Sequence, residues 1–180
     1  MSHPREPEPV KLILSLFSPE KDLVETVVDE LSEAFGPVDW ISKACFFDRT
    51  RYYEREMGWP LHRRFVSFER LVPPEDIVDI KLRTNECEQK YLAGKTRRIN
   101  IDPGYISAER LILATGKNYV HRIYLSRGIY ADLTLVFHQG KFGLLPWTYR
   151  DYAEPWIREE FRKVRETYME QRREKKALDQ

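Results

Sequence analysis

The feature that most constrains the fold is a short apolar run that leads directly into a helix signal. Residues 11–17, KLILSLF, are nearly all apolar, which is typical of a strand that is buried on both of its faces. Ser18 can cap a helix, and Pro19 suits the first helical position. Gly36 and Pro37 end the helical pattern. Between these signals the apolar positions recur at helical spacing: Leu23, Val27, Val28, Leu31 and Phe35.

The patterns that follow extend the order of elements to β-α-β-β-α-β. Residues 38–47 and 61–72 are predicted strands, joined by a polar and aromatic connection that has no assigned structure. Residues 73–94 form a helix that two prolines open, and residues 97–102 form the fourth strand. This is the order of the split βαβ, or ferredoxin-like, arrangement, in which both helices cover one face of an antiparallel sheet. The predicted fold class is therefore α+β.

A short helix and a hairpin are expected to extend this sheet. A turn at Pro103 and Gly104 leads to a predicted helix over residues 107–115, and a hairpin follows over residues 120–137. A three-residue loop at residues 126–128 keeps one face mostly apolar, whereas a two-residue loop mixes the faces, so the longer loop is predicted. On the apolar face it pairs Leu125 with Ile129, Ile123 with Ala131, and His121 with Leu133. On the polar face it pairs Tyr124 with Tyr130 and Arg122 with Asp132.

The length of 180 residues favours one compact domain with additions at its ends. Residues 1–10 are predicted to be a disordered tail, and residues 11–150 to form the α+β domain. Residues 151–180 are predicted to be a long C-terminal helix that is opened either by a capping pattern at Asp151 or by Pro155 in the first turn. The helix is expected to dock in part and to fray after Met169, because its apolar stripe is short. The docking residues are Ile157, Phe161, Val164 and Tyr168.

Charge and cysteine content argue against several classes of protein. The chain has 30 lysine and arginine residues against 29 aspartate and glutamate residues, so no global field attracts it to polyanions or membranes. Any basic surface must therefore be local. The N-terminus is charged where a signal peptide needs an apolar stretch, and no run reaches the roughly 18 apolar residues of a membrane span. Cys45 and Cys87 lack zinc or redox spacing, so we expect a cytoplasmic protein with reduced thiols.

Short motifs indicate no enzyme class. Residues 94–96, GKT, resemble the end of a phosphate-binding loop, but Gln89 stands where that pattern needs a glycine. The four histidines lack metal-ligand spacing, so no metal site is predicted. The sequence leaves open whether the protein is an enzyme and whether it uses a cofactor.

The strongest candidate site comes from strand alternation. Side chains two residues apart on a strand point to the same side, which brings polar residues of separate segments to one face of the predicted sheet. Guanidinium groups and phenols can hold a phosphate or carboxylate, and two carboxylates can hold a cation or act as bases. The residues predicted to form this polar face or to lie near it are Arg98, Asn100, Asp102, Lys117, Arg122, Tyr124, Tyr130 and Asp132.

Two other interpretations stay open. The polar face is equally consistent with a solvated surface on which Arg122 and Asp132 form a weak cross-strand ion pair. An RNA-binding interpretation rests on residues 65–68, FVSF, which match the second half of the RNP1 pattern. Arg63 stands at the other stacking position, and the net charge is close to zero, so RNA is the weaker candidate partner.

Three segments carry a resemblance to a known family: RFVSFERLVPPEDIVDIKLRTNE, RRINIDPGYISAERLILATGKNYVHRIYLSRGIYADLTL and LPWTYRDY. They resemble a prokaryotic family of uncharacterised proteins of about this length, catalogued as a domain of unknown function and sometimes labelled GTP-binding protein. The resemblance covers most of residues 11–152 and implies no established reaction, ligand or catalytic residue. The chain itself has neither a phosphate-binding loop nor a guanine-reading NKxD tetrad.

Taken together, the sequence favours a cytoplasmic domain that binds a small anionic ligand, a nucleotide or a phosphorylated metabolite, on the polar sheet face. The alternative is a non-enzymatic module that contacts a protein or RNA partner through the charged C-terminal helix and the connection over residues 48–60. The ligand hypothesis depends on the Arg98, Asp102 and Arg122 arrangement.

Overall fold

The computed structural model describes residues 3–47, 51 and 53–178, which form an α+β fold. The strands are β1 (Val10–Ser18), β2 (Val38–Ile41), β3 (Cys45–Phe46), β4 (His62–Val72), β5 (Asn100–Ile106), β6 (Arg110–Thr115), β7 (Arg122–Ser126), β8 (Ile129–His138) and β9 (Lys141–Leu144). The helices are α1 (Lys21–Phe35), α2 (Glu54–Met57), α3 (Ile77–Lys90) and α4 (Pro155–Leu178), and the 3-10 turn η1 (Pro74–Asp76) precedes α3.

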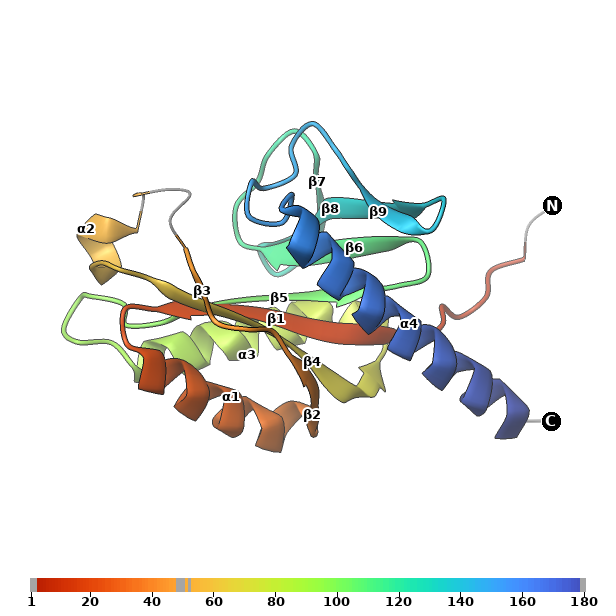
Figure 1. Cartoon of the computed structure of the whole chain (residues 1–180), viewed down its shortest axis with the longest axis horizontal. Coiled ribbons are helices and arrows are strands. Elements are labelled where there is room, and N and C mark those ends of the chain that lie inside the picture. Colours follow the sequence, from red (N-terminus) through yellow and green to blue (C-terminus); the bar gives the residue numbers. More distant parts are fainter. Residues whose placement is uncertain (1–2, 48–50, 52, 179–180) are drawn as a thin grey trace.

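The elements form three layers, with the sheet in the middle (Figure 1). Within the described residues the sheet has nine strands, in the order β2-β4-β1-β5-β6-β8-β7, with β3 paired to β4 and β9 paired to β8. Every pairing is antiparallel. Helices α1 and α3 cover one face, and α4 crosses the other face (Figure 1). The sheet is thus larger than the four-stranded core with an added hairpin that the sequence predicts.

Strand β1 lies in the interior of the sheet and is buried along its whole length, as its apolar run predicts. Successive side chains of a strand point to opposite faces. Leu12, Leu14 and Leu16 therefore belong to the core beneath α1 and α3, whereas Ile13 belongs to the core beneath α4. One strand supplies both hydrophobic cores, which explains why it shows no polar alternation.

The predicted turn at Pro103 and Gly104 and the predicted helix over residues 107–115 are both wrong. Strand β5 runs through both residues to Ile106, and β6 covers residues 110–115. A run buried on both faces has no strand periodicity, so its pattern cannot be told from that of a short helix. Gly104 serves close strand packing instead of a turn, because a Cβ there would lie 2.3 Å from the Ile112 carbonyl oxygen.

The predicted strand over residues 38–47 is divided into β2 and β3. Ser42, between them, uses its hydroxyl oxygen to accept the Phe65 N–H at 3.0 Å, while its own N–H donates to the Phe65 carbonyl at 2.8 Å. A side-chain oxygen in place of a backbone carbonyl interrupts the regular ladder. The aromatic rings of β4 are also not available to stack on RNA bases, because Phe65 and Phe68 are buried in the two cores.

The hairpin of β7 and β8 keeps three of its five predicted pairs. These are Arg122 with Asp132, Ile123 with Ala131, and Tyr124 with Tyr130. The three-residue loop is wrong, since Ser126 pairs with Ile129 and a two-residue turn joins them. That turn is favoured because its left-handed residues match the strand twist. A bulge between Tyr124 and Ser126 restores the register. Strand β9 has no counterpart in the prediction.

Helix α4 docks on the sheet through Ile157, Phe161, Val164 and Tyr168, the four residues that the apolar stripe indicates. Its helical geometry continues to Leu178, and the fraying predicted after Met169 stays a prediction. In the described part of the chain, no helix combines the length and the apolar character needed to cross a membrane.

Candidate functional site

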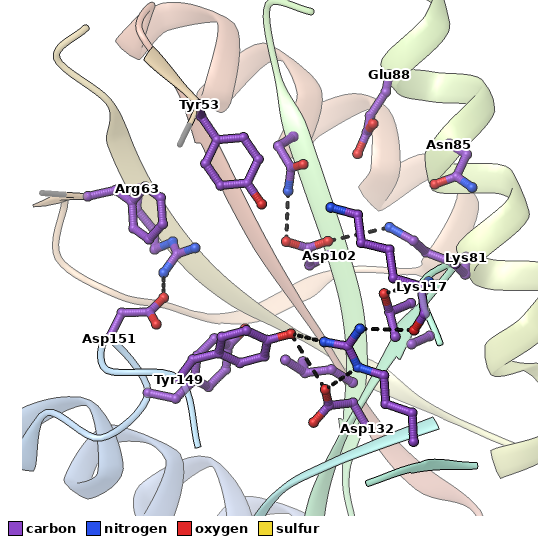
Figure 2. Close-up of a pocket in the computed structure, with 18 of the residues that line it drawn as sticks. Tyr53, Arg63, Lys81, Asn85, Glu88, Asp102, Lys117, Asp132, Tyr149 and Asp151 are labelled. Carbon is purple, nitrogen blue, oxygen red and sulfur yellow. Dashed lines mark hydrogen bonds and ion pairs between the residues drawn. The ribbon is translucent and has the colours of Figure 1, made fainter. Parts of the chain in front are cut away.

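The pocket lies where two neighbouring strands separate. Residues 104–106 of β5 pair with β6, whereas residues 100–103 have a strand partner only on the other side, in β1. A pocket of about 840 Å³ occupies the space between the separated ends. Its walls come from α3, from the segment around Phe47 and Tyr53, and from the segment that precedes α4 (Figure 2).

Side chains of α3 take the place of the missing strand neighbour. The Ile101 N–H donates to Glu88 Oε1 at 2.6 Å, and Lys81 Nζ donates to the Ile101 carbonyl at 3.0 Å. In an antiparallel strand the backbone N–H and C=O groups of alternate residues point to the same neighbouring strand. Those of Ile101 and Pro103 therefore point to the side that β6 leaves open. Pro103 has no N–H to bond there, and the Ile101 backbone is satisfied without a strand. The separation of β5 from β6 therefore leaves no unpaired backbone donor at these two residues.

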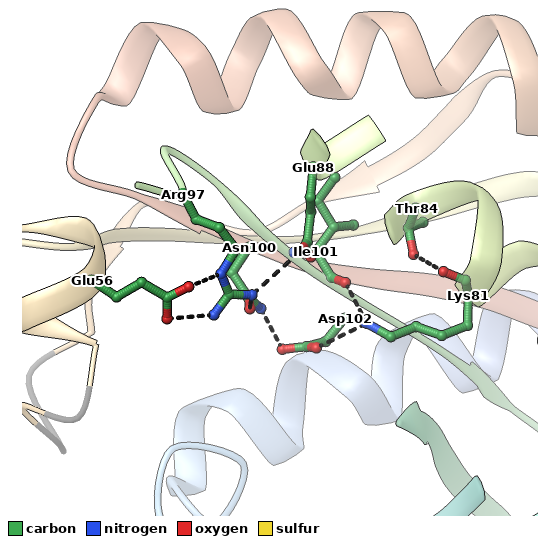
Figure 3. A network of polar contacts seen from close by, with 8 residues as sticks. All are labelled: Glu56, Lys81, Thr84, Glu88, Arg97, Asn100, Ile101 and Asp102. Atoms are coloured by element: carbon green, nitrogen blue, oxygen red, sulfur yellow. Dashed lines mark hydrogen bonds and ion pairs between the residues drawn. The ribbon is translucent and has the colours of Figure 1, made fainter. Parts of the chain in front are cut away.

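One wall of the pocket is a chain of polar contacts that starts at Arg97 (Figure 3). Arg97 donates to Glu56 through Nε at 2.5 Å and through Nη2 at 2.9 Å. Its Nη1 donates to Asn100 at 2.9 Å and to Glu88 at 3.3 Å. Asn100 Nδ2 in turn donates to Asp102 at 2.7 Å. These contacts fix the orientation of the Asn100 amide and thereby of the Asp102 carboxylate.

Asp102 is the acidic group at the centre of the pocket. Lys81 Nζ lies 3.4 Å from its carboxylate. Burial and, to a smaller extent, Asp102 raise the pKa of Tyr53 to about 12. Burial is also the main cause that raises the pKa of Tyr149 and of Tyr152, and Asp102 contributes to both. The three phenols therefore stay protonated at neutral pH. The Tyr149 hydroxyl has the Asp132 carboxylate as its acceptor, at 3.5 Å.

Asp132 and Tyr149 lie on another wall of the pocket (Figure 2), and Arg122 contacts both of them. Arg122 donates to Asp132 at 2.9 Å, to the Lys117 carbonyl at 2.9 Å and to the Tyr149 hydroxyl at 2.5 Å. His121 Nε2 lies 3.2 Å from the same Asp132 carboxylate. The side chains of Arg122 and Asp132 are only 11% and 1% exposed. Arg122 thus joins the strand hairpin to the segment before α4 and holds Tyr149 in one orientation.

A buried arginine closes the aromatic side of the pocket. The Arg63 guanidinium carbon lies 4.0 Å from the centroid of the Phe47 ring, and the group pairs with Asp151. Burial lowers the pKa of Arg63, but an arginine keeps its charge in proteins. Since Asp151 belongs to the segment that precedes α4, this ion pair ties that segment to β4.

The pocket is locally basic although the whole chain is almost neutral. Six cationic side chains line it against four acidic ones, whereas the chain carries a formal net charge of +1. The cationic residues are Arg63, Lys81, Arg97, Lys117, Arg122 and Arg150, and the acidic residues are Glu88, Asp102, Asp132 and Asp151.

The structure brings five of the eight predicted site residues together at this pocket: Asn100, Asp102, Lys117, Arg122 and Asp132. It places Arg98 elsewhere, in an exposed ion pair with Glu20 at 2.6 and 2.7 Å. The expectation that Arg98 shares a strand face with Asn100 is wrong, because β5 begins at Asn100. Tyr124 and Tyr130 pack edge to face on each other, with ring centroids 5.3 Å apart, and do not line the pocket.

Several pocket residues were missed by the sequence prediction. Lys81, Asn85 and Glu88 recur at helical spacing and form a polar stripe on α3. The helix was predicted from its apolar positions alone, so this polar stripe was not used. Arg63 and Tyr149 carry no comparable signal, because only the tertiary fold places them beside β5. Among the residues that the structure describes, no three histidine, cysteine, aspartate or glutamate side chains converge as metal ligands would.

The fold and the pocket define an α+β domain with a basic, aromatic-lined pocket at a gap in its sheet. A family model described as Domain of unknown function (DUF4416) matches residues 8–168, and the chain belongs to this family. The comparison with curated proteins gave no match, and the comparison with solved structures gave none either.

Proposed function

We propose that the protein binds a small anionic ligand, a nucleotide or a phosphorylated metabolite, in the pocket between β5 and β6. The observation that carries this proposal is the excess of cationic side chains in a pocket of about 840 Å³, inside a chain that is close to neutral. Ligand sites are typically concave, partly aromatic and supplied with a few convergent polar groups, which describes this pocket. Whether the bound ligand then reacts is a separate question.

The residues of the pocket divide into those that contact a ligand and those that hold them in place. Arg122 already donates to three partners, so its role is to position Tyr149 and the Lys117 backbone. Lys117 is the better candidate for direct contact, since its side chain points into the pocket (Figure 2). The pKa of Glu56 on the far wall is lowered mainly by Arg97 and to a smaller extent by Lys117.

The test is a thermal-shift screen over nucleotides, sugar phosphates and divalent metals, followed by isothermal titration of each compound that stabilises the protein. A ligand at about 100 times its dissociation constant stabilises by roughly 2.7 kcal/mol, which such a screen detects. Lys117→Gln is expected to weaken binding by about tenfold, because a charge-assisted contact is lost. Arg98→Gln is the matched control and leaves binding unchanged. If no compound of the panel binds, the proposal is wrong.

The alternative is a non-enzymatic module that contacts a protein or RNA partner. Its support is the outer part of α4, where the buried positions end at Tyr168 and residues 173–178 are exposed. Part of the connection that the sequence assigned to the same role, Arg49 and Tyr52, lies outside the described residues. This function would be favoured if truncation after Met169 abolishes binding of the protein or RNA partner and Lys117→Gln leaves that binding unchanged.

We also infer a ferredoxin-like plan for the first part of the chain. The supporting observations are the local strand order β2-β4-β1-β5, the antiparallel pairing, and the shared apolar core beneath α1 and α3. A reducing compartment such as the cytoplasm is proposed because Cys45 and Cys87 lack zinc and redox spacing, and because Cys87 is a buried thiol.

A further inference from the structure

The two ends of the pocket differ in chemistry. The lysine end consists of Lys81, Gly116 and Lys117, at the side of α3 and the end of β6. The aromatic end consists of Phe47, Tyr53, Tyr149 and Tyr152. Tyr53 and Tyr149 lie on the other side of Asp102 from Lys81 (Figure 2). A phosphate ion or a sugar phosphate uses only the lysine end. A ligand that fills both ends needs an anionic group and an apolar, flat group in one molecule.

Tyr149 has the properties of a stacking platform at the aromatic end. Its side chain is exposed, at 41%, and it lines the pocket. Arg122 Nη2 donates to its hydroxyl at 2.5 Å, so the ring is held in place before any ligand arrives. A fixed aromatic ring loses little conformational entropy when a base stacks on it. The tilted ring of Tyr152, with its centroid 6.2 Å away, supports Tyr149 from behind.

The lysine end suits a phosphate group. Lys81 and Lys117 come from different elements and both line this end of the pocket. Gly116 adds no side chain between them, so an anion can approach the backbone. Asp102 lies between the two ends and is oriented by Asn100 at 2.7 Å. A carboxylate in that position can accept hydrogen bonds from sugar hydroxyl groups.

We propose that the ligand of this pocket is a nucleoside phosphate, with its base stacked on Tyr149 and its phosphate held by Lys81 and Lys117. The sugar lies across Asp102. This inference rests on the proposed function and narrows its ligand class from any small anion to one that carries a planar base.

The experiment titrates the protein with the 5′-phosphates of the four common ribonucleosides and then takes the tightest of them apart. The nucleotide is compared with ribose 5-phosphate, which lacks the base, and with the nucleoside, which lacks the phosphate. Base stacking on an aromatic side chain supports a preference of about tenfold or more over ribose 5-phosphate. Removal of the phosphate is expected to weaken binding by at least as much.

Two variants separate the ends of the pocket. Tyr149→Ala is expected to reduce the affinity for the nucleotide to about that for ribose 5-phosphate and to leave ribose 5-phosphate binding itself little changed. Lys117→Gln is expected to lower the affinity for the nucleotide and for ribose 5-phosphate and to leave the affinity for the nucleoside unchanged. Tyr149→Phe keeps the ring and loses the hydroxyl that Arg122 holds. Its nucleotide affinity is expected to fall between that of the natural protein and that of Tyr149→Ala, which separates stacking from orientation of the ring.

The outcomes distinguish the two proposals. If a sugar phosphate binds at least as tightly as every nucleotide, or if Tyr149→Ala weakens nucleotide and ribose 5-phosphate equally, the nucleoside phosphate assignment is overturned and the pocket still binds an anion. If nucleotides, sugar phosphates and inorganic pyrophosphate all fail to bind, both proposals are overturned.

Discussion

The two faces of the sheet use the same strands for different purposes. The face beneath α1 and α3 carries one hydrophobic core, which includes Leu12, Leu14 and Leu16 of β1. Beneath α4 the apolar core covers only part of the face. Next to the start of α4 the charged pocket opens on this face, with Arg63 and Asn100 among its lining residues, and side chains of α3 reach it through the gap between β5 and β6. A face that a helix covers completely supports the fold, and a face that is covered in part leaves room for a ligand.

The largest expected effect tests the covered face. Leu16 is fully buried between β4, β5 and the helices. Leu16→Ala is expected to lower the free energy of unfolding by about 2–5 kcal/mol, because it removes apolar contact and leaves a cavity. Lys117→Gln, in the pocket, is expected to change it by no more than about 0.5 kcal/mol. Denaturant unfolding measures both, and equal losses would contradict the division between the faces.

The next effect tests the strand contact at the edge of the pocket. A Cβ at Gly104 would lie 2.3 Å from the Ile112 carbonyl oxygen and 2.7 Å from a Leu113 methyl carbon. Gly104→Ala must therefore push β5 and β6 apart, at a cost of about 1–3 kcal/mol of stability. Gly116→Ala is the matched control, since the nearest atom to its Cβ would be 4.0 Å away. Thermal unfolding of the two variants compares them, and a Gly104→Ala protein as stable as the control would show that the contact is not tight.

A smaller effect depends on pH and comes from the carboxylate that replaces a strand neighbour. Burial raises the pKa of Glu88 above its ordinary value. A raised pKa means that the folded state binds the proton of Glu88 more tightly than the unfolded state does. Protonated Glu88 therefore contributes to the free energy of unfolding. This contribution is complete below the unfolded pKa of about 4.3 and is lost as pH rises through the folded pKa. Glu88→Gln cannot ionise and can still accept the Ile101 N–H. Its stability relative to the natural protein is expected to rise between pH 4 and pH 7.5, as measured by urea unfolding. A difference that is constant with pH would contradict the shift.

The smallest effect is expected at Arg98, outside the pocket. Arg98 and Glu20 form an exposed ion pair, and such pairs contribute little to stability because solvent screens them. Arg98→Gln is expected to change the unfolding midpoint only slightly and to leave ligand binding intact. A clear loss of binding in calorimetry would instead show that Arg98 contributes to the ligand site.

Local patterns were sufficient to predict the covered face. The apolar run of β1, the spacing of α1 and the two prolines before α3 each depend on neighbouring residues, and each of the three elements lies close to where the sequence puts it. Strand β6 was missed because it is buried on both faces, and β9 because it is only four residues long. The error at β6 arises because burial removes the periodicity that distinguishes a strand from a helix.

The pocket was predictable only in part, for a physical reason. Asn100 and Asp102 follow from alternation along one strand, and Arg122 and Asp132 from the pairing of one hairpin, so pattern and register were enough. Arg63 joins the pocket because β4 pairs with β1, a contact between distant segments that no local pattern encodes. The separation of β5 from β6 depends on Pro103 and on the α3 side chains that satisfy Ile101, and this combination is visible only in three dimensions.

The most direct test of the central claim is an NMR titration of the isotopically labelled protein with a compound that stabilises it. The account predicts amide shift changes at Gly116 and Lys117, at Asn100 to Asp102, and at Tyr149 to Tyr152, with little change at Gly36 beneath the opposite face. Shift changes confined to residues 169–178 of α4 or to residues 123–126 of β7, with the pocket amides unmoved, would contradict it.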